Sequence, residues 1–162
     1  MLLALYLLFI ALIGGATAQI GDPSGKKEER PTLDLSDIKN NLQGLQNNLL
    51  SIFENFSEMY GIRDNPPIIV NNSDWYSDLN LIDFLYKFGK HYRLSDMINK
   101  DVVKRRLEVA AENAGDPNAG ISLQGFMYQA VQAYDWLHLS QKHDCYIQLG
   151  GNDQFGNIFY LF

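Results

Sequence analysis

Three short apolar runs constrain the fold of this 162-residue chain more than any other feature. They cover residues 9–13, 67–70 and 145–149, and glycine or small polar residues follow each of them. Short apolar runs with such boundaries are typical of buried β-strands. The long stretches between them carry helical patterns, as the crossover connections of a parallel sheet require. The sequence therefore predicts an α/β fold with an open, mostly parallel sheet and flanking helices.

The spacing of apolar residues predicts where several helices lie. Residues 35–60 place one apolar stripe on one helix face, formed by Leu42, Leu45, Leu49, Phe53 and Phe56. Residues 79–88 and 102–109 show similar spacing. Glycine, proline and asparagine interrupt the pattern in residues 111–120, which we expect to form an exposed loop.

A further helix is predicted after this loop. Ser122 has a side chain suited to capping a helix that runs to about His143. The residues expected to face inward are Leu123, Phe126, Ala130, Ala133 and Leu137.

Length and composition favour a single domain spanning residues 1–162. A hydrophobic content of 46% is enough for one core. The formal net charge of -6 argues against a protein that coats nucleic acid without regard to sequence, because such proteins need a basic face. Cys145 is the only cysteine, so no internal disulfide can form, and we expect a buried thiol.

The amino-terminal residues resemble a secretory signal in one respect. An apolar run covers residues 1–13 and is followed by the small residues Ala16, Thr17 and Ala18. No Lys or Arg precedes the run, and two glycines interrupt it before the apparent cleavage site. Secretion, with glycosylation at Asn55 and Asn71, is therefore only a weaker alternative. Because a membrane span needs about 20 apolar residues, we expect no membrane association.

Polar residues follow each of the three predicted strands. They lie in residues 14–30, 71–75 and 150–157. Taken separately, each cluster is better explained as a turn or a solvated run of charge. In an open parallel sheet, however, ligands bind beyond the carboxyl ends of the strands. Together the clusters offer an acid for hydroxyl groups, glycine backbone amides, and cations for a polyphosphate, which indicates a nucleotide site.

One predicted helix carries polar residues on a shared face. Tyr128, Gln132 and Asp135 are separated by four and three positions. A buried carboxylate without a partner is costly, so we expect Asp135 to be hydrogen-bonded. Its partner is either another group of the protein, which is the preferred reading, or a hydroxyl of a ligand.

These motifs together resemble the tyrosyl-tRNA synthetases of class I. The resemblance runs from about residue 11 to 158 and is carried, in order, by residues 14–25, Asn71-Asn72, Asp74-Trp75, residues 128–135 and residues 148–158. It implies a Rossmann-like catalytic domain that activates L-tyrosine with ATP and Mg²⁺ and transfers it to tRNA(Tyr). It also implies a homodimer.

The resemblance implies a role for each matching residue. For tyrosine binding these are Thr17, Asp22, Tyr128, Gln132, Asp135 and Gln154, with Asp135 on the phenol. For ATP or adenylate binding they are Asn72, Gly151 and Asp153, and for stabilising the leaving pyrophosphate they are Lys26 and Arg30. No metal ligand is expected from the protein.

The chain also departs from the family pattern. The HIGH motif, the KMSKS loop and the tRNA-binding domains have no counterpart in it, so we expect a catalytic domain truncated at both ends and weak activity or none. The alternative function is that of an inactive fragment which keeps partial tyrosine or adenylate binding, or dimerises. Residues 40–58 and 78–91 resemble the mitochondrial branch, which favours the mitochondrial matrix and leaves a cytoplasmic location as the alternative.

Overall fold

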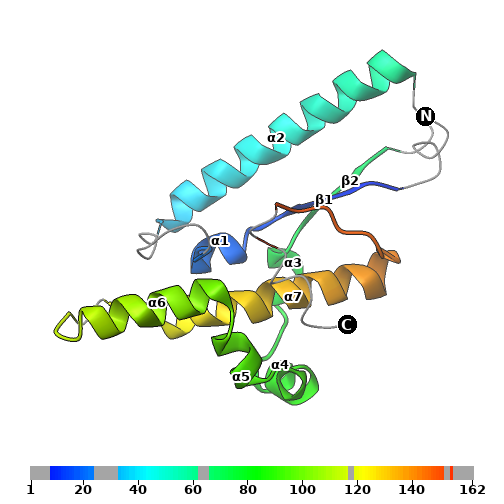
Figure 1. Ribbon diagram of the computed structural model, residues 1–162. Helices are drawn as coiled ribbons and strands as arrows, with labels where there is room; N and C mark the ends of the chain where they lie inside the picture. Colours follow the sequence, from blue (N-terminus) through cyan, green and yellow to red (C-terminus); the bar gives the residue numbers. More distant parts are fainter. Residues whose placement is uncertain (1–7, 24–32, 62–65, 117–118, 152–153, 155–162) are drawn as a thin grey trace. The chain divides into compact units, whose positions relative to one another are not determined.

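The computed structural model describes residues 8–23, 33–61, 66–116, 119–151 and 154 (Figure 1). The chain forms two compact units. The first comprises Met1–Gln19 and Leu33–Asp78, and the second comprises Ile20–Thr32 and Leu79–Phe162. The single domain expected over residues 1–162 stays a prediction.

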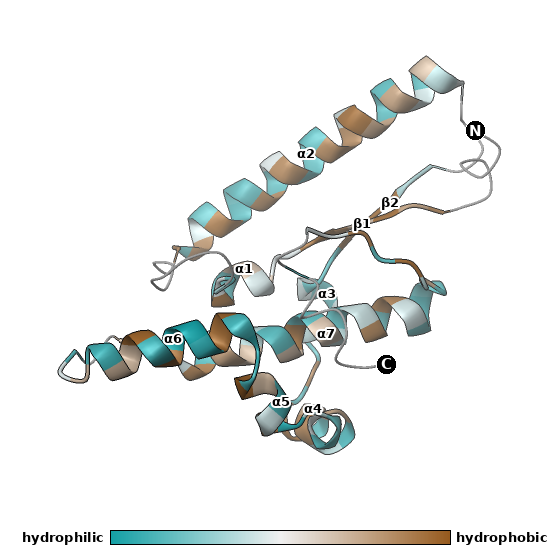
Figure 2. Cartoon of the chain, in the orientation of Figure 1, coloured by the Kyte–Doolittle hydropathy of each residue, from teal (hydrophilic) through white to brown (hydrophobic). Residues whose placement is uncertain are grey.

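The first unit contains a parallel pair of strands. β1 (Ile10–Ile13) pairs with β2 (Ile68–Asn71), with Ile10 opposite Ile68 and Ile13 opposite Asn71. Figure 2 shows β1 in the hydrophobic colour, in keeping with its aliphatic sequence. Two of the three predicted strands are therefore confirmed, and so is their parallel direction.

The crossover between these strands contains the short helix α1 (Thr17–Ile20) and the long helix α2 (Leu35–Tyr60). The predicted bounds of α2 are confirmed. The helix ends at Gly61, whose φ of 64° is left-handed and therefore favours glycine. A second short helix, α3 (Ser73–Tyr76), follows β2.

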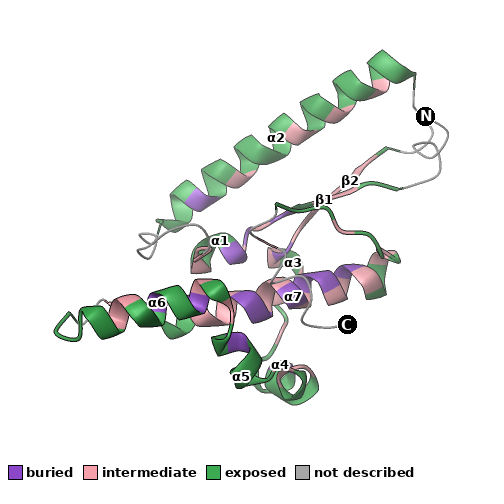
Figure 3. Ribbon diagram, viewed as in Figure 1, coloured by how far each residue is buried: buried purple, intermediate pink, exposed green. Residues whose placement is uncertain are grey.

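The apolar stripe of α2 is only partly covered. Ile38 is buried and Phe53 packs edge-to-face on Phe9, with ring centroids 5.6 Å apart. Leu45 and Phe56 of the predicted stripe are exposed, and Figure 3 shows most of α2 in the exposed colour. A helical period thus fixes which residues share a face, but it does not determine how much of that face another element covers.

The prediction of a third strand is wrong. Residues 145–149 form no strand, and Tyr146, Ile147 and Leu149 are 75%, 67% and 82% exposed. An apolar run becomes a strand only when a neighbour completes its hydrogen-bond ladder, and the part of the chain that is described supplies none for this run. Cys145 is half-buried rather than buried, with its sulfur 3.7 Å from the carbonyl oxygen of Ile147.

The second unit is helical over its described residues. Its elements are α4 (Leu81–Lys87), the 3₁₀ turn η2 (Gly89–His91), α5 (Leu94–Ile98), α6 (Asp101–Glu112) and α7 (Leu123–His143). Its core cluster consists of Phe84, Met97 and Ala130, surrounded by half-buried aromatic and aliphatic side chains. The hydroxyl of Tyr92 donates to the carbonyl oxygen of Ala130 at 2.9 Å, which joins the segment after η2 to α7.

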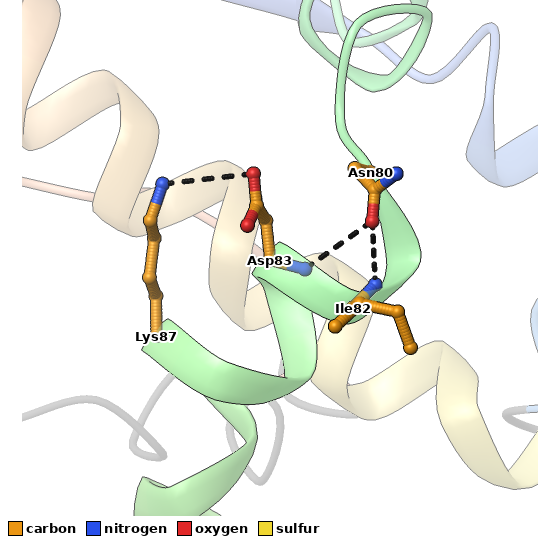
Figure 4. A network of polar contacts seen from close by, with 4 residues as sticks. All are labelled: Asn80, Ile82, Asp83 and Lys87. Atoms are coloured by element: carbon orange, nitrogen blue, oxygen red, sulfur yellow. Dashed lines mark hydrogen bonds and ion pairs between the residues drawn. The ribbon is translucent and has the colours of Figure 1, made fainter.

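Local hydrogen bonds explain where α4 begins. The side-chain oxygen of Asn80 accepts from the backbone amides of Ile82 and Asp83 at 2.8 and 3.4 Å (Figure 4). These are amides that the helix itself cannot satisfy. Lys87 approaches Asp83 at 3.9 Å, but both side chains are exposed, so this ion pair adds little stability. The predicted helix over residues 79–88 is confirmed with slightly narrower bounds.

The predicted helix over residues 102–109 is confirmed as α6, which continues to Glu112, so the predicted loop begins later than expected. Gly120 ends that loop with a left-handed φ of 110°. A Cβ atom added there would lie 3.2 Å from the Cβ of Ala110. A residue with a side chain would therefore be strained by conformation and crowded by its neighbour.

The predicted cap of α7 is also confirmed, because the Ser122 side chain accepts from the amide of Gly125 at 3.1 Å. Ala130 and Ala133 are buried as expected, whereas Leu123 is 76% exposed, so its inward assignment is wrong. The apolar cluster meets α7 first at Phe126, about one turn beyond Leu123. Among the described helices, none has the length and apolar character needed to cross a membrane.

Candidate functional site

The polar groups that follow β1 and β2 meet in the first unit, as parallel pairing requires. The amide of Gly15 donates to the side-chain oxygen of Asn71 at 3.1 Å, and the amide of Ala16 donates to that of Asn72 at 2.7 Å. These bonds join residues 56 positions apart in the sequence. The two asparagines therefore fix the backbone that leaves β1.

Asn72 and Thr17, which are both predicted site residues, are joined by a hydrogen bond. The side-chain amide of Asn72 donates to the hydroxyl oxygen of Thr17 at 3.0 Å. Asn72 is 0% exposed and Thr17 is 7% exposed. A buried polar pair of this kind specifies a single local arrangement, since every other arrangement would leave buried polar atoms without partners.

The neighbours of Gly15 leave no space for a side chain at this position. A Cβ atom at this position would collide with the side-chain oxygen of Asn71 and lie 2.5 Å from the hydroxyl oxygen of Ser73. The sequence pattern predicts a nucleotide as the partner of the glycine backbone amides in this cluster. The contacts of Gly15 show instead that the side chains following β2 occupy this space.

The second unit joins residues from the first and last polar clusters. The side-chain amide of Gln154 donates to a carboxylate oxygen of Asp22 at 3.1 Å, although 132 positions separate the two residues. The side chain of Gln124 on α7 donates to the carbonyl oxygen of Ile20 at 2.6 Å. Asp22 and Gln154, both expected at a tyrosine site, are therefore in direct contact.

The continuous helix α7 carries the three predicted polar residues on one face. Tyr128 and Gln132 are half-buried, while Asp135 is only 3% exposed, as the sequence indicated. Burial raises the pKa of the neighbouring Tyr134, and the charge of Asp135 raises it further. One turn further on, burial lowers the pKa of His138, with smaller contributions from Lys142 and His143.

The remaining predicted site residues contribute less to the described geometry. Gly151 is exposed, and its carbonyl oxygen accepts from the amide of Gln154 at 2.9 Å. Lys26, Arg30 and Asp153 lie outside the described residues. Their assigned roles stay predictions.

Sequence reasoning assigned no role to three residues near this site. Asn71 and Gln124 hold the backbone at Gly15 and Ile20, and Gln129 is 5% exposed with its side-chain oxygen lacking a hydrogen bond among the described residues. Asn71 could have been noticed because it follows β2 directly. The contact of Gln124 with Ile20 and the burial of Gln129 depend on tertiary packing and leave no local signal.

Comparison with known families supports the fold and the order of these motifs. The family model of the class I tRNA synthetases (W and Y) matches residues 5–160. The chain belongs to this family. Its parallel strands and flanking helices are thus part of a class I tRNA synthetase catalytic fold.

Curated relatives of this chain carry the name tyrosine--tRNA ligase. The mitochondrial enzyme of Drosophila melanogaster is 45% identical over 155 residues, a match covering 92% of this chain and 32% of the relative. The enzyme of Flavobacterium psychrophilum is 42% identical over 149 residues, with the same two coverages. The chain spans about a third of the length of these relatives.

Solved structures show the same likeness. A C-terminally truncated mitochondrial tyrosyl-tRNA synthetase of Aspergillus nidulans superimposes with a TM-score of 0.80 at 33% identity, over 95% of this chain and 42% of that one. The corresponding protein of Coccidioides posadasii gives a TM-score of 0.75 at 31% identity, over 95% of this chain and 40% of that one. The Rossmann-like fold expected from the sequence is therefore confirmed.

Proposed function

We propose that this synthetase chain is part of a tyrosine-tRNA ligase, which activates tyrosine with ATP and transfers it to tRNA(Tyr). The identity of 45% to a mitochondrial tyrosine--tRNA ligase supports the assignment. The geometric observation that carries it is the hydrogen bond between Gln154 and Asp22, because it joins two residues assigned to one amino-acid site.

In the proposed reaction, an oxygen of the tyrosine carboxylate attacks the α-phosphorus of ATP. A mixed anhydride forms and pyrophosphate leaves, so no nucleophilic side chain is needed. The protein would accelerate the reaction by positioning the reactants and by stabilising the charge that develops in the transition state. Lys26 and Arg30 are proposed to stabilise the pyrophosphate.

The remaining residues are proposed to bind the other groups of tyrosine and ATP. Asp22, Tyr128 and Gln132 are proposed to bind the tyrosine ammonium group, and Asp135 the phenol. Gly151 and Asp153 are proposed to bind the ribose and adenosine of ATP. Within the described residues, no group of three His, Cys, Asp or Glu side chains could hold a metal ion. Mg²⁺ is proposed to enter with the phosphates of ATP, as is usual for this ion.

The direct test is tyrosine-dependent exchange of labelled pyrophosphate into ATP by the purified chain, with phenylalanine as the control amino acid. Exchange with tyrosine alone would support the proposed activation step. Absence of exchange, together with measurable tyrosine binding, would favour the inactive-fragment alternative. Absence of both would contradict a tyrosine site in this chain.

The burial of Asp135 gives a prediction about selectivity. We expect Asp135→Ala to weaken tyrosine binding at least about tenfold more than phenylalanine binding, because only tyrosine has a phenol hydroxyl to pair. The measurement is titration calorimetry with both amino acids. Asp83→Ala, an exposed change on α4, is the matched control. Equal losses for both amino acids at position 135 would contradict the assigned role.

A homodimer is part of the same proposal. Large apolar side chains are exposed on α4 and α5, namely Leu81, Ile82, Leu85, Tyr86, Leu94 and Ile98. Such a group is typical of a protein interface, and the occupant we propose is a second copy of this chain. Sedimentation should show a dimer that Ile82→Asp dissociates. A monomeric native chain would contradict this part of the proposal.

The proposed location is mitochondrial, supported by the mitochondrial relatives in Drosophila and Aspergillus. The bacterial relatives keep a cytoplasmic location as the alternative. Cell fractionation with an antibody against the chain distinguishes the two compartments.

A further inference from the structure

Two glutamine side chains hold the chain on either side of Gly21. The side-chain nitrogen of Gln124 lies 2.6 Å from the carbonyl oxygen of Ile20. The side-chain nitrogen of Gln154 lies 3.1 Å from a carboxylate oxygen of Asp22. All of these residues belong to the second unit. The short segment around the glycine is therefore anchored on both sides within that unit.

Gly21 is the point at which this segment can rotate. Its φ of 80° is left-handed, and glycine adopts positive and negative φ about equally readily. Asp22, by contrast, precedes Pro23, which restricts the backbone of residue 22 to extended conformations. The direction of the Asp22 carboxylate therefore depends mainly on rotation at Gly21. The hydrogen bond to the Ile20 carbonyl limits that rotation.

Gln124 ties this segment to the face of α7 that carries two residues proposed to bind the tyrosine ammonium group. Tyr128 lies four positions after Gln124, and Gln132 lies four positions after Tyr128, so the three residues share one face of the helix. The start of α7 is itself held, because the Ser122 side chain accepts from the amide of Gly125 at 3.1 Å. Gln124 therefore donates from a helix turn that is capped in place.

We propose that Gln124 is a positioning residue, which holds the Ile20 carbonyl and so keeps the Asp22 carboxylate in place for the ammonium group of tyrosine. This inference rests on the proposed function, in which Asp22 binds that group. A carbonyl oxygen can only accept, so the Gln124 group in contact with Ile20 is its NH₂ donor. Without this donor, rotation at Gly21 would move the Asp22 charge away from the ammonium group.

The test compares three ligands on the full chain by titration calorimetry. Tyrosine and phenylalanine carry the ammonium group, whereas desaminotyrosine keeps the phenol and the carboxylate of tyrosine and lacks the ammonium group. Gln124→Met keeps the length and the helix preference of the side chain and removes its donor. We expect this variant to bind both amino acids about 3- to 10-fold more weakly, the usual effect of one hydrogen bond, and to bind desaminotyrosine unchanged.

Gln141→Met, the same change at an exposed position of α7, is the matched control. It should leave the affinity for all three ligands unchanged. An equal loss for all three ligands in Gln124→Met, or no loss for any, would overturn the inference while leaving the proposed function intact. If the unaltered chain bound neither amino acid, the proposed function would fail and the inference with it.

A double-mutant cycle tests whether Gln124 acts through Asp22. Asp22→Asn removes the charge proposed to bind the ammonium group, so adding Gln124→Met to it should cost little further affinity for tyrosine. Fully additive losses would show that Gln124 supports the fold without positioning Asp22. The cycle needs tyrosine alone, so its result does not depend on how tightly desaminotyrosine binds.

The side-chain NH₂ group of Gln154 provides a readout without any ligand. It donates to Asp22 at 3.1 Å, so its NMR signals report whether the carboxylate stays in place. Gln124→Met should shift these signals and speed their exchange with water, whereas Gln141→Met should do neither. Unchanged signals in Gln124→Met would show that Gln124 does not hold Asp22, and would overturn the inference whatever the binding results.

Discussion

At the residue scale, the first unit depends on the small volume of Gly15. We expect Gly15→Ala to destabilise the chain by about 2 kcal/mol, because the new methyl group would displace Asn71 and Ser73 from their hydrogen-bonded positions. Denaturant unfolding followed by circular dichroism would measure the change. Gly44→Ala is the matched control, since nothing lies within 4 Å of a Cβ atom there. In the interior of helix α2 it should stabilise by about 0.5–1 kcal/mol. Equal effects at the two positions would contradict the packing at Gly15.

Lys100 is the residue for which the structure predicts a pH effect. Burial lowers the pKa of its ammonium group from 10.5 to about 8. Below pH 8 the group is charged in both states, and the folded state bears the cost of desolvation. Between pH 8 and 10.5 only the unfolded state keeps the proton, so stability rises with pH in that window.

Lys100→Met should therefore stabilise the chain at pH 7, by about 1 kcal/mol after allowance for partial exposure. The gain should shrink towards pH 10.5. Urea unfolding at several pH values measures this gain in the free energy of unfolding. Lys104→Met, an exposed change on α6, is the matched control. A gain at position 100 that stays constant with pH would mean that packing, and not charge, is responsible.

At the scale of elements, side-chain caps stabilise the first turns of α4 and α7. Ser122→Ala removes the acceptor of the Gly125 amide, and we expect a loss of about 1 kcal/mol in the free energy of unfolding. Ser51→Ala, an exposed change within α2, should be neutral or slightly stabilising because alanine favours helices. Thermal unfolding of the two variants is the comparison. A neutral Ser122→Ala would mean that packing alone positions the start of α7.

At the scale of the whole molecule, the division into two compact units predicts separable opening reactions. Ile13→Ala removes a buried side chain of the first unit, and Met97→Ala removes one from the core cluster of the second. Each should cost about 2–4 kcal/mol in its own unit. Native-state hydrogen exchange should show faster opening of β1 and β2 in the first variant and of α7 in the second. Equal acceleration throughout the chain in both variants would show a single cooperative unit.

The sequence by itself determined the local structure of this protein. The bounds of α2, the Ser122 cap and the strands β1 and β2 follow from patterns within a few residues, because such patterns set backbone preferences and local hydrogen bonds. The order of the motifs likewise identified the family, which the match over residues 5–160 confirms. The shared face of Tyr128, Gln132 and Asp135 needed only a continuous helix.

Only the tertiary structure decided which distant groups meet. The contact between Asp22 and Gln154 spans 132 positions, and the bond between Thr17 and Asn72 spans 55. The exposure of residues 145–149 and of Leu123 was equally absent from the local pattern. The reason is physical: hydrophobicity states that a side chain gains from burial, whereas a neighbouring element must supply the surface that buries it. The need for glycine at position 15 is another tertiary effect. It becomes visible only when the side chains of Asn71 and Ser73 are seen to occupy the adjacent space.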